Sequence, residues 1–372
     1  MNPMSWPSPP TPLPSMGEGS QCVHAPRFSL PISGAGKFKA DAPPSPRLFW
    51  ERGVGGVRAF LLLSLLILLA GCNNEDAKSN NPPQTSTSSA GGFPRTVTDG
   101  RGKSVVIPAA PQRIVSLAPS NTEILFALGL DSRIAGVTSQ CDFPPDAKKK
   151  PNVGGYPISA EKVLVLNPDL VVTVGAINTK ETEALEQAHI PVVSVNPKSL
   201  TDVFDAIKLI GQATGQDTQS DVITETMKAE IEVTENALSK SNHRPKTLII
   251  HGVSPLYTTN PDSYIAEVIT SAGADYLVKT NLPGSVISPE ALLLNPPDVI
   301  VCSPELVQPV SALPGFTQGI PAVRNHRFYT DAALIDRPGP RLPQAIDHLA
   351  RYLHPECFPP AKSPATPAAK PQ

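Results

Sequence analysis

The chain lacks the short motifs that mark most hydrolases, nucleotide-binding enzymes and zinc proteins. No GxSxG, HExxH or GxxxxGK[ST] sequence occurs downstream of residue 72, and no GxGxxG sequence occurs there either. The five cysteines form no CxxC pair, and the seven histidines are not spaced as a metal cluster. We therefore expect a protein that is not an enzyme, and we assign no catalytic and no metal-ligating residue.

The chain also has few tryptophans and a small net charge. Both tryptophans, Trp6 and Trp50, precede the one long apolar run, so the chain beyond that run has none. A net charge of -2 gives no electrostatic reason to expect binding to nucleic acid. The 372 residues, of which 40% are hydrophobic, are enough for two ordinary domains.

The apolar run predicts secretion. It extends from Ala59 to Ala70, is broken only by Ser64, and follows Arg58. It is shorter than the ~20 residues that span a bilayer, but it suits the core of a signal peptide at 54–71. The sequence Leu-Ala-Gly-Cys at its end resembles the bacterial lipoprotein processing box, in which Cys72 would be acylated.

The segments around this signal complete the predicted envelope protein. Residues 72–94 are rich in Asn, Ser, Thr and Gly, a composition typical of a flexible tether. We expect a protein held by lipid on the outer face of the cytoplasmic membrane or in the periplasm. Residues 1–53 have no regular pattern and precede a signal that normally comes first. We interpret them as an extension that is not native, with the true start near Val54 or Val57.

Beyond the tether, short apolar strands alternate with amphipathic helices, a rhythm typical of α/β domains with mainly parallel sheets. The pattern predicts an N-terminal lobe at 95–198, a helical linker at 199–244, a C-terminal lobe at 245–357 and a disordered tail at 358–372. The expected strands cover 113–117, 133–138, 169–174, 191–195, 247–252, 298–303 and 327–330.

The linker has no strand candidate. A capped helix begins after Ser199, and from Asp217 about twenty-four residues follow without Gly or Pro. At ~1.5 Å per residue such a helix is ~35 Å long. The predicted fold is therefore two Rossmann-like lobes joined by one long rigid helix.

One phrase occurs in both lobes. "ISAEKVLVLNPDLVV" begins at Ile158, and "ISPEALLLNPPDVIV" begins at Ile287. Each Ser is a candidate helix cap, and each Glu (Glu161, Glu290) falls in a first helical turn. Such a Glu offsets the positive helix end by some 0.3–1 kcal/mol without any further role. Its recurrence at matched places also suits a twofold partner with two basic pockets.

The globular chain resembles the periplasmic binding proteins with a helical backbone, which serve ABC importers of vitamin B12, iron-siderophores and haem. The stretches that carry this resemblance are "RIVSLAPSNTEILFALGL", "SQCDFPP", "PNVGG", "DRPGPRL" and "YLHPE". Their order over some 240 residues is most similar to the cobalamin-binding branch. No single one of them is specific.

The resemblance implies how such a protein works. A monomer holds its small-molecule ligand, here cobalamin or a related corrinoid, between two lobes, and it needs no cofactor. A surface Glu from each lobe docks on arginines of the permease dimer, which acts with its ATPase subunits. The matching positions here are Glu161 and Glu290. An iron-siderophore or haem-binding lipoprotein of the same fold remains the alternative.

Ligand contacts in this fold come from loops at the carboxyl ends of strands. Three candidates have a second explanation: Ser120 also fits a capping box with Glu123, His251 also fits a hydrogen-bonded core residue, and Arg341 also fits an ion pair. The chain departs from the cobalamin binders in lacking tryptophan, which leaves room for a bulkier corrinoid or another ligand. The candidate ligand contacts are Ser120, Gln140, Cys141, Tyr156, His251, Tyr257, Arg337 and Arg341.

Overall fold

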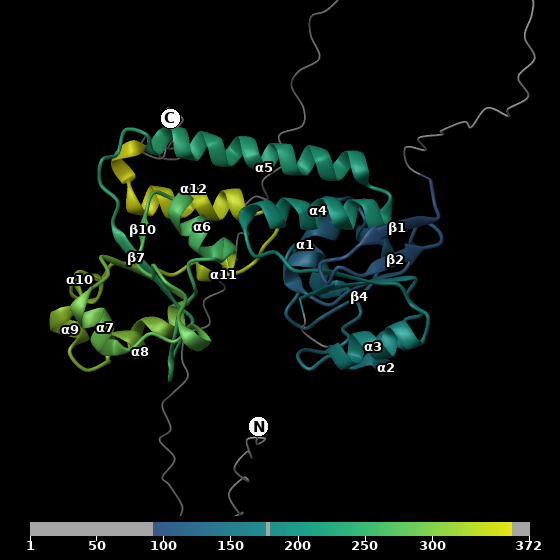
Figure 1. Ribbon diagram of the computed structural model, residues 1–372, viewed down its shortest axis with the longest axis horizontal. Coiled ribbons are helices and arrows are strands. Elements are labelled where there is room, and N and C mark those ends of the chain that lie inside the picture. The colour runs from purple at the N-terminus through teal and green to yellow at the C-terminus, as the bar shows by residue number, and fades with distance from the viewer. Residues whose placement is uncertain (1–91, 176–178, 359–372) are drawn as a thin grey trace, which may run out of the picture. The chain divides into compact units, whose positions relative to one another are not determined.

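The computed structural model describes residues 92–175 and 179–358 (Figure 1). The chain separates into two units, 1–82 and 83–372, and every described residue belongs to the second. The predicted signal peptide, the lipidated Cys72, the extension at 1–53, nearly all of the tether and the tail beyond residue 358 lie outside the described residues. For the part described, the fold is the predicted one.

The N-terminal lobe is built on a parallel sheet of four strands in the order β4-β3-β5-β6. Its strands are almost entirely buried, as in a parallel sheet covered on both faces. The strands are β3 (Ile114–Ser116), β4 (Ile134–Val137), β5 (Leu170–Val174) and β6 (Val192–Val195), and the helices of this lobe are α1 (Pro119–Ala127), α2 (Ala160–Val165) and α3 (Thr179–Gln187).

The C-terminal lobe repeats the design with a parallel sheet in the order β10-β7-β11-β12. Shorter helices surround it, and the last helix, α12, is buried along one face. The strands are β7 (Lys246–Ile250), β10 (Asp275–Tyr276), β11 (Val299–Cys302) and β12 (Phe328–Tyr329). The helices are α6 (Tyr264–Ser271), α7 (Pro289–Leu294), α8 (Val307–Ser311), α9 (Phe316–Gly319), α10 (Pro321–Arg324), α11 (Ala332–Ile335) and α12 (Leu342–Leu353).

The linker contains two helices, α4 (Leu200–Thr214) and α5 (Asp217–Leu238). Gly215, at φ 76°, ends α4 in the left-handed conformation that favours glycine. A Cβ on Gly211 would come within 2.5 Å of the Ser220 Cβ, so the close approach of the two helices requires glycine there. The long helix of the prediction is α5, at 22 residues, and it packs on both α4 and α12 (Figure 1).

Two small hairpins were not predicted. The first joins β1 (Arg95–Thr98) to β2 (Ser104–Ile107), and the second joins β8 (Gly252–Val253) to β9 (Leu256–Tyr257). In the first hairpin buried and exposed residues alternate, and the sequence there is too polar to stand out from the tether. Its turn is held by the buried Asp99, whose carboxylate accepts hydrogen bonds from the backbone amides of Arg101 and Lys103.

In the described residues, no helix is both long enough and apolar enough to cross a bilayer.

Candidate functional site

A cluster of ion pairs joins the two lobes. Glu123, on α1, is 3% exposed and accepts two hydrogen bonds from Arg341, at 2.8 Å from Nε and 2.6 Å from Nη2. This two-bond geometry is the strong form of an Arg–carboxylate pair. Arg337 lies 3.4 Å from Glu123 and 2.5 Å from the Asp142 carboxylate. The N-terminal lobe thus supplies the acids and the C-terminal lobe the arginines.

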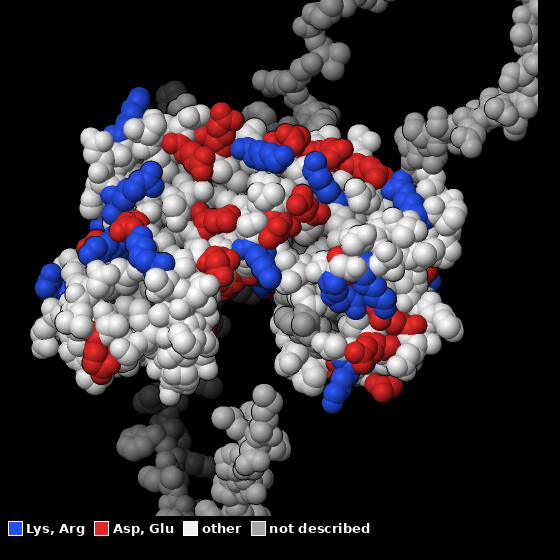
Figure 2. Space-filling model, in the orientation of Figure 1, with Lys and Arg blue, Asp and Glu red and all other residues white. Residues whose placement is uncertain are grey.

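An aromatic ring borders this cluster. The Arg341 guanidinium carbon lies 3.8 Å from the centroid of the Phe143 ring, within the range of a cation–π contact. The hydrogen bond from Arg337 lowers the pKa of the Asp142 carboxyl, and the same bond raises the pKa of Arg337. The charged pair is therefore stabilised at neutral pH. In Figure 2 the surface is hollowed between the two lobes.

His251 and Asp336 extend the cluster on the C-terminal side. His251 Nε2 lies 2.8 Å from Thr259 Oγ1, and Nδ1 lies 3.8 Å from the Asp336 carboxylate. Desolvation raises the pKa of Asp336, against the opposing fields of His251 and Arg337. In the described part of the chain, no three His, Cys, Asp or Glu side chains are placed to hold a metal ion together. The partners of the His251 ring are thus Thr259 and Asp336, the residue before Arg337.

The exposed aromatic side chains come from both lobes. Tyr156 is 76% exposed, Tyr257 is 43% exposed and Phe143 is 39% exposed. The first and third lie in the segment after β4, and Tyr257 lies on β9, soon after β7 ends. The Tyr257 carbonyl accepts a hydrogen bond from the His251 amide, which places the tyrosine beside that histidine. The Tyr156 and Tyr257 side chains are thus accessible from solvent, whereas Arg341 covers one face of the Phe143 ring.

Two predicted contacts are buried. Cys141 is 3% exposed, and its sulfur lies 3.1 Å from the hydroxyl oxygens of both Thr122 and Thr138, within the core. Ser120 is 6% exposed. Gln140 is exposed, and its side-chain amide lies against Gly155.

The predicted capping box at the start of α1 is wrong. The helix begins at Pro119 after Ala118, and no side chain caps it. The Glu123 carboxylate is taken up by the two arginines instead. Sequence reasoning therefore missed Glu123, and it also missed Asp142, Phe143 and Asp336. The sequence did contain a signal for Glu123. An acid within an otherwise apolar helix needs a partner, and Arg337 and Arg341 were candidates for that partner.

The repeated phrase forms the same local structure in both lobes. The hydroxyl oxygens of Ser159 and Ser288 accept hydrogen bonds from backbone amides in the first turns of α2 and α7, at 3.3 and 3.1 Å. Asp169 and Asp298 accept hydrogen bonds from backbone amides at the starts of β3 and β7, so each ties its turn to the first strand of its sheet.

The two glutamates of the repeated phrase lie at the surface of their lobes. Glu161 and Glu290 are exposed, in the first turns of α2 and α7. In Figure 1 both helices lie on the side of their lobe away from α5. Ser159 donates a hydrogen bond to Glu161 at 2.7 Å, which lowers the pKa of that carboxyl.

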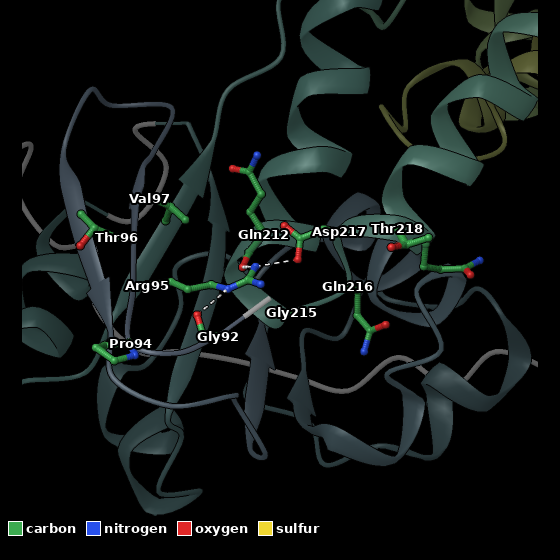
Figure 3. Close-up of a pocket in the computed structure, with 11 residues that line it drawn as sticks. Gly92, Pro94, Arg95, Thr96, Val97, Gln212, Gly215, Gln216, Asp217 and Thr218 are labelled. Carbon is green, nitrogen blue, oxygen red and sulfur yellow. Dashed lines mark hydrogen bonds and ion pairs between the residues drawn. The ribbon is translucent and has the colours of Figure 1, made fainter. Parts of the chain in front are cut away.

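A separate hollow of about 700 Å³ lies where β1 meets the turn between α4 and α5 (Figure 3). Arg95 spans it, donating to the Gln212 carbonyl at 2.8 Å and pairing with Asp217 at 2.7 Å. None of the predicted ligand contacts lines it.

Comparison with known proteins defines the class. A family model described as periplasmic binding protein matches residues 114–333, which is more than half of the chain. The chain therefore belongs to the periplasmic binding protein family. Its fold and family are those of the substrate-binding proteins of ABC transporters, as the sequence resemblance implied.

Three individual proteins show the range of ligands named for similar chains. An uncharacterized ABC transporter substrate-binding lipoprotein of Bacillus subtilis strain 168, YvrC, is 33% identical and aligns over 82% of this chain and 98% of its own length. A vitamin B12-binding protein of Vibrio vulnificus strain CMCP6 is 31% identical, over 67% of this chain and 93% of its own length. A periplasmic heme-binding protein from Pseudomonas aeruginosa superposes with a TM-score of 0.62 at 25% identity, over 68% of this chain and 95% of that structure.

Proposed function

We propose that this protein is the substrate-binding lipoprotein of an ABC importer and that it captures cobalamin or a related corrinoid between its lobes. The observation that supports the ligand class is the presence of exposed tyrosines in both lobes together with guanidinium groups at the junction of the lobes. Tyr156 and Tyr257 offer flat apolar faces, one from each lobe, and Arg337 and Arg341 lie where the lobes meet.

The chemistry of a corrinoid suits these groups. Its ring is a broad apolar plate with amide side chains and a phosphate, and aromatic rings stack on such plates. Guanidinium groups are planar donors that match amide and phosphate oxygens. The likeness to the vitamin B12-binding protein of Vibrio vulnificus supports the same choice.

Haem or an iron-siderophore is the second candidate. The observation in its favour is His251, whose backbone amide pairs with Tyr257 and whose imidazole is a common type of metal ligand. Haem carries two carboxylates, which the arginines would also bind. The fold shared with the Pseudomonas heme-binding protein is compatible with this alternative.

Anchoring and docking complete the proposal. Cys72 would carry the lipid that keeps the protein at the membrane. Glu161 and Glu290, exposed at matched places, would pair with arginines of a permease dimer that works with ATPase subunits.

The test is calorimetric titration of a chain beginning at residue 73 with cyanocobalamin, and with haem and a ferric siderophore in parallel. We expect one-to-one binding of cyanocobalamin. Tyr156→Ala and Tyr257→Ala should each weaken it by about ten- to a hundredfold, since burial of one aromatic side chain is worth roughly 1.5–3 kcal/mol. Val233→Ala on α5, which truncates an exposed apolar side chain away from the junction of the lobes, is the control. Binding of haem or siderophore without cyanocobalamin would move the ligand to the second candidate.

A further inference from the structure

Exposed apolar side chains are distributed unevenly over the described residues. Leu294 is 88% exposed and Val165 is 77% exposed, and no other large hydrophobic side chain in the described part of the chain is exposed as far. Single exposed apolar side chains are common on protein surfaces, so it is the recurrence of high exposure at matched places that calls for an explanation.

These two residues occupy the same position in the repeated phrase. Each lies four residues after the Glu of its copy, Val165 after Glu161 and Leu294 after Glu290. Residues four apart share one face of a helix, so each lobe presents a carboxylate with an apolar side chain one turn further on.

Packing within the C-terminal lobe explains the partial burial of Leu293, but no such packing covers Leu294 or Val165. Leu293 is partly covered, because α9 brings Gly315 and Gly319 against its side chain. No comparable cover lies over Leu294 or Val165, as their exposure shows. The helices α2 and α7, which carry these exposed residues, both lie on the side of their lobe away from α5 (Figure 1).

We propose that each of these faces is a compound docking site, in which Val165 and Leu294 enter apolar depressions beside the basic groups that receive Glu161 and Glu290. The inference rests on the proposed importer function and adds to it the chemistry of the partner. The partner is a twofold permease surface that offers two equal sites, each with a cationic group bordered by an apolar recess.

The choice of occupant follows from charge and from repetition. A lipid surface would favour basic residues around exposed apolar ones, whereas here each apolar residue has an acid beside it. A second copy of this chain would place acid against acid across a twofold axis, which is unfavourable. A symmetric partner with basic sites fits both copies of the face.

The identity of the partner is tested by photo-crosslinking. A photoreactive residue is placed at 165 or at 294 in the full chain, expressed in cells that make the protein, and the adducts are identified by mass spectrometry. We expect both positions to give an adduct with the permease subunit of an ABC transporter. Positions 222 and 233 on α5, which are also exposed apolar sites, should not. Adducts with lipid only, adducts with a second copy only, or no adduct at either position would overturn the proposal.

The apolar contribution is then measured with nearly isosteric polar variants. ATPase stimulation of the crosslinked transporter, purified in nanodiscs, is titrated with the lipoprotein carrying Val165→Thr, Leu294→Asn or both. Each substitution should raise the half-saturating concentration about tenfold, and the pair about a hundredfold. Val222→Thr and Val233→Thr are the matched controls and should leave it unchanged.

Two further variants separate this inference from the proposed function. Glu161→Gln and Glu290→Gln remove the acids alone. If these weaken stimulation and the apolar variants do not, the docking role of the acids stands and the compound site is rejected. If neither set changes stimulation, both fail. Cyanocobalamin titration of all variants should give wild-type affinity, because the altered residues belong to the outer helices α2 and α7.

Discussion

The two lobes are alike where α2 and α7 present their acids and unlike where they face each other. On the outer helices a Ser cap, an exposed Glu and an exposed apolar residue recur in register. At the junction of the lobes, one side contributes Glu123 and Asp142, and the other contributes arginines. A symmetric partner requires like faces, whereas a ligand without twofold symmetry is held best by unlike ones.

The largest expected effect comes from removing the acid at the centre of the junction. Glu123→Gln leaves Arg341 without its bidentate partner and weakens the hold on Arg337. Removing one partner of a buried ion pair leaves the other charge uncompensated and costs about 3 kcal/mol. The free energy of unfolding, measured in urea, should fall by that amount. Glu225→Gln, which removes an exposed acid paired with Lys228 on α5, should leave the unfolding midpoint unchanged.

Equal midpoints for Glu123→Gln and wild type would mean that the charges at the junction do not hold the lobes together. The difference between the two inner faces would then concern the ligand alone.

The second effect concerns a feature of one lobe, the hairpin that Asp99 holds. Desolvation raises the pKa of the Asp99 carboxyl, but hydrogen bonds from the Arg101 side chain and from the amides of Arg101, Lys103 and Ser194 outweigh it and lower the pKa. A lowered pKa in the folded state stabilises the protein above the unfolded value of about 3.9, and this stabilisation is lost as the pH falls through the folded value.

Asp99→Asn should therefore cost about 2 kcal/mol at pH 7, and the gap to wild type should narrow progressively as the pH falls below about 4. Urea unfolding at a series of pH values measures both quantities. The exposed Asp146→Asn is the control for a general effect of charge. A gap as wide at pH 3 as at pH 7 would show that the Asp99 contribution is not electrostatic.

Several of these features could be predicted from the sequence and several could not. Seven of the eight strands in the two parallel sheets and α5 were predicted because their apolar pattern is strong, and Ser159 and Ser288 were found because a cap is a local pattern. The two-residue strand β10 was not predicted, because it is too short to show a pattern. Glu123 was misjudged because its partners lie more than two hundred residues away, at Arg337 and Arg341.

Distance along the chain and burial also explain the other differences between the predicted and the observed site. Asp142 was not singled out, since an acid in a loop gains meaning only from the arginine that faces it. Cys141 was placed in a ligand loop, but its sulfur turns inward to Thr122, and a sequence does not record that orientation. Local patterns thus predict elements, while a junction between lobes depends on contacts that cross them.

A smaller effect tests the likeness of the outer helices. Ser159→Ala and Ser288→Ala each remove a helix cap, and a lost serine cap costs typically about 1 kcal/mol. Because the two caps have similar geometry, the two losses should agree within about 0.5 kcal/mol in urea unfolding. Thr226→Ala on α5, which removes a side-chain bond within a helix and no cap, serves as the control. Losses that differ twofold or more would show that the repeat is one of sequence but not of energetics.

The smallest expected effect is a difference between the urea concentrations at which the two lobes unfold. Each lobe contains one buried thiol, Cys141 beside α1 and Cys302 in β11. Burial raises the pKa of Cys302 to about 11, so this thiol reacts only when the strand opens. Labelling of each cysteine in increasing urea, read by mass spectrometry, therefore follows the opening of each lobe separately.

We expect the two labelling midpoints to coincide within about 0.3 M urea, since one continuous apolar cluster includes Cys141 and Cys302 and runs through α4, α5 and α12. Cys357, which is half-buried near the end of the described chain, should be labelled without urea and so checks the reagent. In Glu123→Gln the midpoints should stay together but shift to lower urea. If Cys141 in Glu123→Gln is instead labelled at a much lower urea concentration than Cys302, the lobes of that variant open separately. The ion pairs at the junction, rather than the shared core, then couple the unfolding of the two lobes.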